Sequence, residues 1–394
     1  MSYGYLLDLA LILLSTKVLS LVTKRFKLPQ VVGALLAGLI LGPALFNVID
    51  ETDFIKQLAE VGVIVLLFTA GLESNLSEFK KSGKTSFIVA TMGVIIPLIG
   101  GTILAYCIND GKVGNVNIFL QNIFIGSVLT ATSVSITVET LRELGKVSTS
   151  VGNIIVGAAI IDDVLGMLVL TVITSLADSS VSVVMVVVKI VSFFIFSVIV
   201  GIITYKLFNK WVDKYDIDKR RFVIVSFVIC LLLSFSAEKF FGVADITGAY
   251  IAGLVLSSNK ETIYITKRFE TLSYILLSPV FFASVGLNVK LPYLNGEIVM
   301  VTIALIIVAV LTKIIGCGLG AKLCGYNNME SIQIGSGMVT RGEVTLIIAS
   351  KGLTLGLISS YFLAPIIIMV VFTSIFTPIL LKIVFSRDKS SVQC

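Results

Sequence analysis

The sequence predicts an all-α polytopic membrane protein of about 13 transmembrane helices, with inverted repeats and two crossed broken helices. Three observations lead to this fold class: recurring apolar runs, a charge bias between alternating loops, and an internal repeat at a fixed offset. The chain of 394 residues is 56% hydrophobic and 14% charged, whereas a soluble protein is about 25% charged. The apolar runs are continuous, which argues against the alternating strands of a transmembrane β-barrel.

Hydropathy places the spans, because about 20 apolar residues are needed to cross a bilayer. The first run begins at Tyr5 without a basic leader or a small-residue cleavage site, so we expect a span rather than a cleaved signal. The predicted spans are 5–23, 28–47, 56–73, 85–108, 117–140, 150–176, 182–205, 221–238, 243–257, 271–288, 296–320, 329–350 and 358–381.

The loops between these spans alternate in charge. One set of loops holds 21 Lys and Arg residues, and the opposite set holds five. Because basic loops stay in the cytoplasm, this bias predicts an N-terminus outside and a C-terminus inside the cell. The net charge of +6 is explained by the same bias, so we expect a multi-pass protein of the plasma membrane that contacts lipid and no nucleic acid.

An internal repeat relates the two halves of the chain. VGALLAGLILG (32–42) and TGAYIAGLVLS (247–257) match at six of eleven positions with an offset of 215. Gly71-Leu72 and Gly286-Leu287 match at the same offset. The copies start seven spans apart and so run in opposite directions, which is the inverted repeat typical of secondary transporters.

Inverted repeats of this kind place a broken helix in each copy, and the two cross near the middle of the membrane. GSVLTATSVSITVETL (126–141) is dense in Ser and Thr, and GSGMVTRGEVTLIIAS (335–350) has three glycines and two charges at its centre. Unwound backbone is tolerated at membrane depth only where protein buries it or a wet cavity adjoins it. These two segments are therefore the predicted broken helices.

Two adjacent acids, Asp162 and Asp163, lie inside an apolar span, and Lys313 lies at mid-span in another. A charge at that depth costs about 2.5–3.5 kcal/mol or more, so each needs a partner. Neighbouring residues on a helix point about 100° apart. We therefore expect one acid to pair with Lys313 and the other to face a cavity.

The second acid, with nearby hydroxyls, has the chemistry of a cation site. A hard monovalent cation prefers carboxylate, hydroxyl and carbonyl oxygens, and the first broken segment offers Thr130, Thr132 and Ser133. Burial and like charge raise a carboxyl pKa, so such an acid can take up protons in a chain without histidine. A site for Na+ at Asp162 and Asp163 that holds either the cation or protons is an exchange site.

Other interpretations remain open for each residue. The acids can be a structural ion pair with Lys313 or Arg341, and Lys313 can be a structural lock on them. The Ser and Thr residues can be packing contacts between helices. For Arg341 and Glu343 we favour mutual pairing that neutralises the second break. Lys17 and Lys189 can extend toward the interface.

Several motifs together resemble the monovalent cation:proton antiporter-2 family, in its bacterial sodium/proton antiporter branch. They cover nearly the whole chain: LPQVVGALLAGLILGP (28–43), LLFTAGLES (66–74), the Asp-Asp span, FFASVGLN (281–288), LTKIIG (311–316) and TRGEV (340–344). The resemblance implies a homodimer with dimerisation and core subdomains and elevator-like movement of the core.

The resemblance also implies roles for individual residues. Asp163 resembles the acid that binds the ion and the proton, and Asp162 resembles the acid paired with the lysine, here Lys313. Thr130 and Thr132 resemble hydroxyls beside the site, and Glu343 resembles a charged residue of the second broken helix. Relatives that exchange without net charge tend to have Asn in place of the first acid, so Asp-Asp with Lys resembles the electrogenic pattern.

The chain departs from relatives that carry a C-terminal nucleotide-binding domain, because only SRDKSSVQC (386–394) follows the last apolar run. We expect one transmembrane unit over residues 1–394 that exchanges Na+ for H+, with K+ and Li+ as further candidate ions. The alternative is a K+/H+ antiporter or a K+ efflux protein without its regulatory domain. A cation channel would not require the inverted repeat, and in a bile-acid-type transporter the carboxylates would repel an organic anion.

We expect no enzyme activity and no cofactor. The chain has no histidine, no paired cysteine spacing and no Walker-type loop, so the residues of a metal centre or an ATPase are missing.

Overall fold

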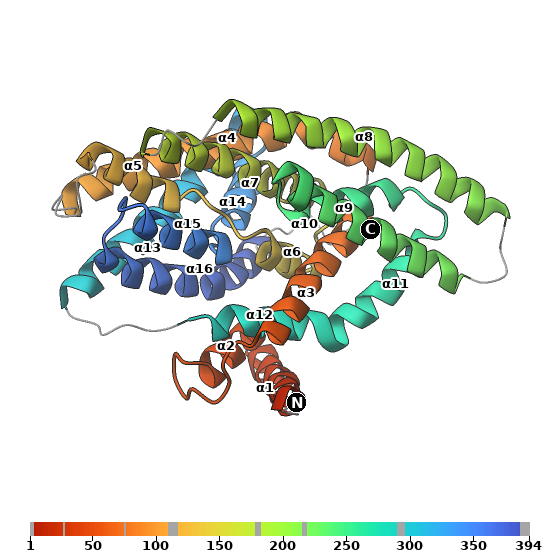
Figure 1. Ribbon diagram of the computed structural model, residues 1–394, viewed down its shortest axis with the longest axis horizontal. Helices are drawn as coiled ribbons and strands as arrows, with labels where there is room; N and C mark the ends of the chain where they lie inside the picture. Colours follow the sequence, from red (N-terminus) through yellow and green to blue (C-terminus); the bar gives the residue numbers. More distant parts are fainter. Residues whose placement is uncertain are drawn as a thin grey trace.

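All regular elements are helical in the residues that the computed structural model describes, which are 4–26, 28–74, 76–108, 117–177, 183–214, 219–289 and 296–386 (Figure 1). The first half comprises α1 (Gly4–Arg25), α2 (Gln30–Leu41), α3 (Asp53–Glu73), α4 (Leu76–Ile108), α5 (Ile118–Val128), α6 (Val134–Glu143), α7 (Ser150–Ala177) and α8 (Val183–Lys214). The second half comprises α9 (Arg220–Phe241), α10 (Asp245–Leu256), α11 (Thr262–Leu272), the π-helix η1 (Ser273–Leu277), α12 (Ser278–Leu287), α13 (Gly296–Leu323), α14 (Asn328–Gly337), α15 (Glu343–Thr354) and α16 (Ser360–Ser386).

Nine helical stretches of the described residues are long and apolar enough to cross a bilayer, which confirms a multi-pass membrane protein. The other four predicted spans fall on shorter helices. α2 and α10 have 12 residues each, or about 18 Å, which is less than the hydrocarbon thickness. The helix count of thirteen therefore remains a prediction.

One predicted span, 271–288, begins too late. In the structure, α11, η1 and α12 form one continuous helical stretch that starts at Thr262. Lys267, Arg268 and Glu270 interrupt the apolar pattern of α11 and hid its start. The π-turn lies just before Pro279, whose missing N–H interrupts the helical hydrogen bonds.

The predicted repeat is visible in the packing of the short helices. α2 of the first half packs on α12 of the second, and α10 of the second half packs on α3 of the first. Gly38 meets the backbone of Ala283 on α12, and its counterpart Gly253 meets the backbone of Gly71 on α3. The same glycine thus brings two backbones together in both halves, as the inverted repeat predicts.

Both predicted helix breaks are present. The first separates α5 from α6 over residues 129–133, and the second separates α14 from α15 over residues 338–342. Ser, Thr and Gly have weak helix preference, because their side chains or their flexibility favour other backbone conformations. Each break lies within the segment that the sequence selected.

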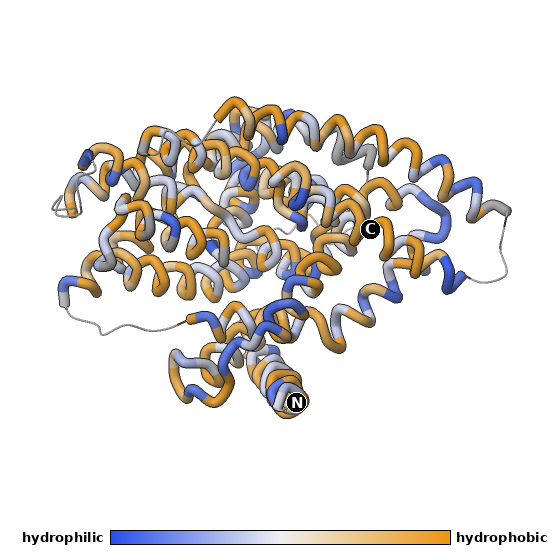
Figure 2. The backbone as a smooth tube through the Cα atoms, viewed as in Figure 1, coloured by the Kyte–Doolittle hydropathy of each residue, from blue (hydrophilic) through white to orange (hydrophobic). Residues whose placement is uncertain are grey.

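The helices form two groups (Figure 1). One group contains α4–α7 and α13–α16, which contact one another. The other contains α1–α3 and α9–α12, with α8 along its outer edge. Figure 2 shows apolar residues along most of each helix and hydrophilic ones mainly toward the ends. Of the residues in the apolar part of α8, 17% are buried, against 72% for α3, so α8 is peripheral and α3 is central.

Candidate functional site

The two helix breaks touch each other. The Ser133 backbone N–H donates to the Thr340 carbonyl at 3.0 Å, and the Thr137 hydroxyl donates to the Gly337 carbonyl at 2.8 Å. Gly342 allows this approach, because a Cβ there would lie 2.7 Å from the Ser133 hydroxyl oxygen. The broken helices therefore cross at Ser133 and Thr340, which are both buried.

Lys313 and Asp162 form a buried ion pair beside this crossing. Lys313 Nζ on α13 lies 2.7 Å from Asp162 Oδ1 on α7, and both side chains have 0% exposure. The other carboxylate oxygen, Oδ2, makes no hydrogen bond to the described residues. The structure therefore contains the acid–lysine pair that the depth of the charges and the resemblance both indicate.

Asp163 differs from its neighbour in exposure. Asp162 is 1% exposed, whereas Asp163 is only half-buried. The 100° step between adjacent helical positions explains the difference, because one carboxylate faces α13 and the other cannot. The structure thus places a fully buried acid next to a half-buried one.

The three predicted hydroxyl residues lie at the first break and are all buried. Thr132 lies beside the Asp162 carboxylate, and its hydroxyl oxygen makes no hydrogen bond to the described residues. Thr130 donates to the Ser127 carbonyl and faces Gly166 on α7, and the Ser133 hydroxyl lies 3.3 Å from that of Ser135. The crossing therefore brings hydroxyl oxygens to the acidic helix.

Arg341 is fully buried at the second break. Its Nη2 donates to the Ala309 carbonyl on α13 at 3.3 Å, while Nε and Nη1 have no hydrogen-bond partner among the described residues. Its backbone is held by Thr373 and Ser374 of α16. The predicted pairing with Glu343 concerns a side chain outside the described residues and stays a prediction.

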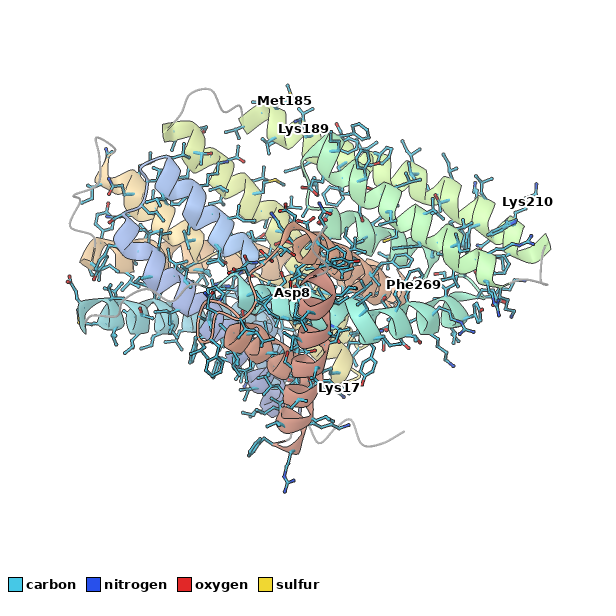
Figure 3. All side chains as sticks on the ribbon, turned by 60° about the horizontal axis from the view of Figure 1, so that its bottom comes forward. Asp8, Lys17, Met185, Lys189, Lys210 and Phe269 are labelled. Carbon is cyan, nitrogen blue, oxygen red and sulfur yellow. The ribbon has the colours of Figure 1, made fainter. Side chains whose placement is uncertain are left out.

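The two remaining intramembrane lysines lie at the outer surface, away from the crossing (Figure 3). Lys17 on α1 is exposed and donates to the Tyr274 hydroxyl of η1, with its Nζ 4.7 Å from the ring centroid. Lys189 on α8 is exposed. Neither lysine joins the buried charges of the site.

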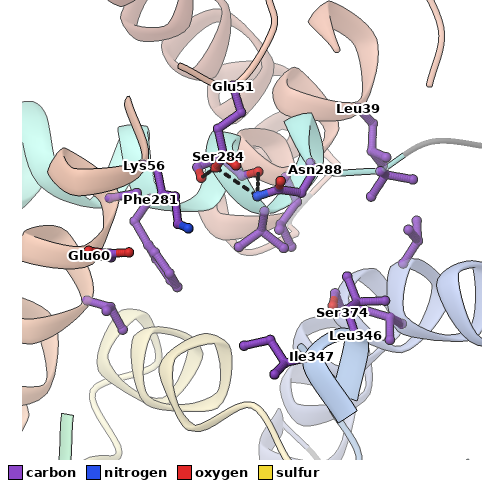
Figure 4. Close-up of a pocket in the computed structure, with 18 of the residues that line it drawn as sticks. Leu39, Glu51, Lys56, Glu60, Phe281, Ser284, Asn288, Leu346, Ile347 and Ser374 are labelled. Carbon is purple, nitrogen blue, oxygen red and sulfur yellow. Dashed lines mark hydrogen bonds between the residues drawn. The ribbon is translucent and has the colours of Figure 1, made fainter. Parts of the chain in front are cut away.

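A cavity of about 480 Å³ separates the two helix groups at the C-terminal end of α2 (Figure 4). Apolar residues such as Leu39, Phe281 and Ile347 line most of it. Its wall also holds Glu51, which accepts hydrogen bonds from the Ser284 hydroxyl and, at 2.8 Å, from Asn288 Nδ2. This first cavity lies between the groups, bounded by α2, α3 and α12 on one side and α15 and α16 on the other.

A second cavity of about 300 Å³ lies at the opposite, N-terminal end of α2. Both cavities are lined in part by α2 and α12. Ala34 and Phe282 line the second cavity, whereas their chain neighbours Leu35 and Phe281 line the first.

The end of α6 beside the second cavity carries contacts that join the two helix groups. Both carboxylate oxygens of Glu143 accept backbone N–H groups at the start of α2, at 2.6 and 3.0 Å. Arg142 lies 3.1 Å from Glu73 on α3 and 3.3 Å from Glu270 on α11. Sequence reasoning missed these residues, because charges at the end of a predicted span look like an ordinary solvated loop.

Gly93 on α4 was also missed, although it makes room for the ion pair. A Cβ at this position would lie 2.5 Å from Cys317 Sγ, 3.5 Å from Lys313 Nζ and 3.6 Å from Asp162 Oδ1. One glycine in a long apolar helix gives no signal in the sequence, because its neighbour belongs to α13.

Gly93→Ala is expected to lower exchange activity severalfold, because the added methyl group pushes Cys317 toward the Asp162–Lys313 pair. Overpacking of this kind costs about 1–3 kcal/mol. Adding Cys317→Ala removes the clashing sulfur and should restore most of the activity. Gly83→Ala on the same helix, where a Cβ meets nothing within 4 Å, is the matched control. Loss in both glycine variants, or no rescue, would contradict the assigned role of Gly93.

Comparison with known proteins identifies the family. The family described as sodium/hydrogen exchanger, transmembrane, matches residues 10–387. The Na(+)/H(+)-K(+) antiporter GerN of Bacillus cereus is 37% identical over 392 residues, covering 99% of both chains. The probable Na(+)/H(+) antiporter GerT of Bacillus cereus is 38% identical over 381 residues, covering 95% of this chain and 98% of GerT.

A solved structure shares the fold. The sodium proton antiporter MjNhaP1 from Methanocaldococcus jannaschii superposes with a TM-score of 0.74 at 18% identity, covering 100% of both chains. With the family match over residues 10–387, it follows that this chain belongs to the sodium/hydrogen exchanger family.

Proposed function

We propose that this chain is a secondary antiporter that exchanges Na+ for H+ at Asp163, with Asp162 and the hydroxyls of the first break beside the ion. The single observation that carries the proposal is the difference in burial between two adjacent acids. Asp162 is fully buried on Lys313, while Asp163 is only half-buried one position further along the same helix. An accessible carboxylate at membrane depth binds a cation or a proton but gains little from both at once.

The supporting chemistry is that of a hard-cation site. Carboxylate and hydroxyl oxygens, and carbonyls released by a helix break, are the ligands that Na+ prefers. Lys313 and Arg341 place two fixed positive charges near Asp162. These fixed charges make it unfavourable for the site to hold a cation and a proton at the same time. A cation that enters the site should therefore displace the proton.

The two cavities support alternating access. They lie at opposite ends of α2, and α2 and α12 line both of them. We propose that the group containing α4–α7 and α13–α16 moves in an elevator-like manner against the group containing α1–α3 and α9–α12. The contacts of Arg142 and Glu143 with α2, α3 and α11 would have to change during that movement.

The Asp162–Lys313 pair supports placing the chain in the cation:proton antiporter-2 branch of its family. The proposal also includes a homodimer in the plasma membrane, with the N-terminus outside, in keeping with the loop charges. K+ is the second candidate ion, because the similar GerN is named as an antiporter of both Na+ and K+. K+/H+ exchange is therefore the alternative function.

Everted membrane vesicles energised by respiration test the exchange directly. A pH-reporting dye is quenched as protons accumulate, and Na+ is then added, followed in a separate run by K+. We expect Na+ to restore the fluorescence with a saturable dependence on concentration. Recovery with K+ alone would select the alternative, and no recovery with Na+, K+ or Li+ would overturn the antiporter proposal.

A further inference from the structure

The second cavity has a polar wall that the proposed exchange site does not use. It is bounded by α1, the start of α2, the end of α6 and η1 with the start of α12. Eight of its lining residues are polar or charged: Thr16, Lys17, Ser20, Gln30, Glu139, Glu143, Tyr274 and Ser278. The cavity thus combines apolar helix faces with a small charged patch at the end of the broken helix α6.

The two carboxylates in this cavity differ in their hydrogen bonding. Glu143 is held in place by α2, because both of its carboxylate oxygens accept hydrogen bonds from backbone N–H groups of that helix. Glu139 lies one turn nearer the crossing, and its Oε2 is a buried atom that makes no hydrogen bond to the described residues. Glu139 therefore has an oxygen without a hydrogen bond to the described residues, whereas each Glu143 oxygen already accepts one.

The positively charged side chains around Glu139 make their shorter contacts with other residues. Arg142 Nη1 lies 4.0 Å from Glu139 Oε2, but its Nε and Nη2 lie 3.1 Å and 3.3 Å from Glu73 and Glu270. Lys17 on the α1 wall donates to the Tyr274 hydroxyl. The charged groups that face Glu139 are thus Arg142 and Glu143 on its own helix, Lys17 on α1, Glu73 on α3 and Glu270 on α11.

The position of Glu139 on α6 places it between the cavity and the crossing. Glu139 and Ser135 are four residues apart and share one face of the helix. Ser135 in turn contacts Ser133 at the break, with 3.3 Å between the hydroxyl oxygens. Six residues of helix separate Glu139 from Ser133, which is about 9 Å along the axis. One face of α6 therefore carries oxygen ligands from the cavity to the crossed helices.

We propose that Glu139 receives the transported cation in the second cavity before it moves to Asp163. This inference rests on the proposed exchange and adds a relay residue to it. The Glu139 carboxylate raises the local cation concentration in a cavity with low-dielectric walls, and the Ser135 and Ser133 hydroxyls continue the path. The loop charges place this cavity on the cytoplasmic side, so Glu139 serves that side alone.

Sided kinetics of Glu139→Gln test this role. We measure the KM for Na+ and kcat of exchange in everted vesicles, where Na+ meets the cytoplasmic side, and in right-side-out vesicles. We expect the KM to rise about 10-fold in everted vesicles, with kcat and the KM in right-side-out vesicles within about twofold of wild type. Glu139→Asp should restore a KM close to wild type, because it keeps the charge.

Glu60→Gln is the matched control, because Glu60 lines the first cavity at the opposite end of α2 (Figure 4). It should leave the KM in everted vesicles unchanged. An unchanged KM for Glu139→Gln in everted vesicles, or an equal loss of kcat from both sides, would overturn the relay role. If wild type itself shows no cation-dependent proton flux, the proposed exchange has failed and the relay role falls with it.

Discussion

Asp163→Asn is expected to lower Na+/H+ exchange at least about 100-fold, the largest effect of any single substitution in this chain. The amide keeps the size of the side chain but can neither carry the negative charge nor take up the transported proton. Because Asp163 is half-buried and Asn is nearly isosteric, the variant should fold and insert like wild type. Sodium uptake into proteoliposomes, driven by an imposed outward proton gradient, measures the loss.

Two further variants separate the role of Asp163 from a general effect of intramembrane charge. Asp163→Glu keeps a carboxylate and should retain part of the exchange with a changed KM. Asp8→Asn removes an acid from α1, which belongs to the other helix group (Figure 3), and should stay within about twofold of wild type. Full activity of Asp163→Asn would exclude Asp163 as the exchange residue.

Lys313→Gln is expected to destabilise the protein by about 3–5 kcal/mol, because it leaves the buried Asp162 carboxylate without its charged partner. Both side chains of this 2.7 Å ion pair are fully buried, so water cannot replace the lost partner. In detergent, the variant should unfold several degrees below wild type.

The double variant Asp162→Asn with Lys313→Gln tests the same pair in a thermodynamic cycle. Replacing both partners removes both buried charges, so the double variant should be more stable than Lys313→Gln alone. A double variant that loses the sum of the two single losses would mean that the residues do not interact.

The sequence predicted those parts of the fold that depend on local composition. Hydropathy located the long helices, and the Ser/Thr-rich and Gly-rich segments located both breaks within a few residues. A pair between Lys313 and one of the two acids was also predictable, because uncompensated charges at similar membrane depth need partners. That the acid is Asp162 was implied by the family resemblance. The inverted repeat could be found because Gly38 and Gly253 make equivalent close contacts.

Features that depend on contacts between distant segments could not be predicted. The role of Gly93 depends on Cys317 of another helix, and the positions of Glu73 and Glu270 around Arg142 depend on how three helices meet. α11 was missed because its charged residues lower the hydropathy of a helix that is nonetheless continuous with α12. Single-sequence patterns hold no information about such neighbours.

Proton release on Na+ binding to the purified protein tests the central claim most directly. Wild-type protein in detergent and weak buffer is mixed with NaCl or with choline chloride at equal ionic strength, and a pH indicator reports the protons released. Saturable release with Na+, absent with choline and absent in Asp163→Asn, is the result that exchange at the two acids predicts. Sodium binding detected by calorimetry without proton release from wild type would contradict it.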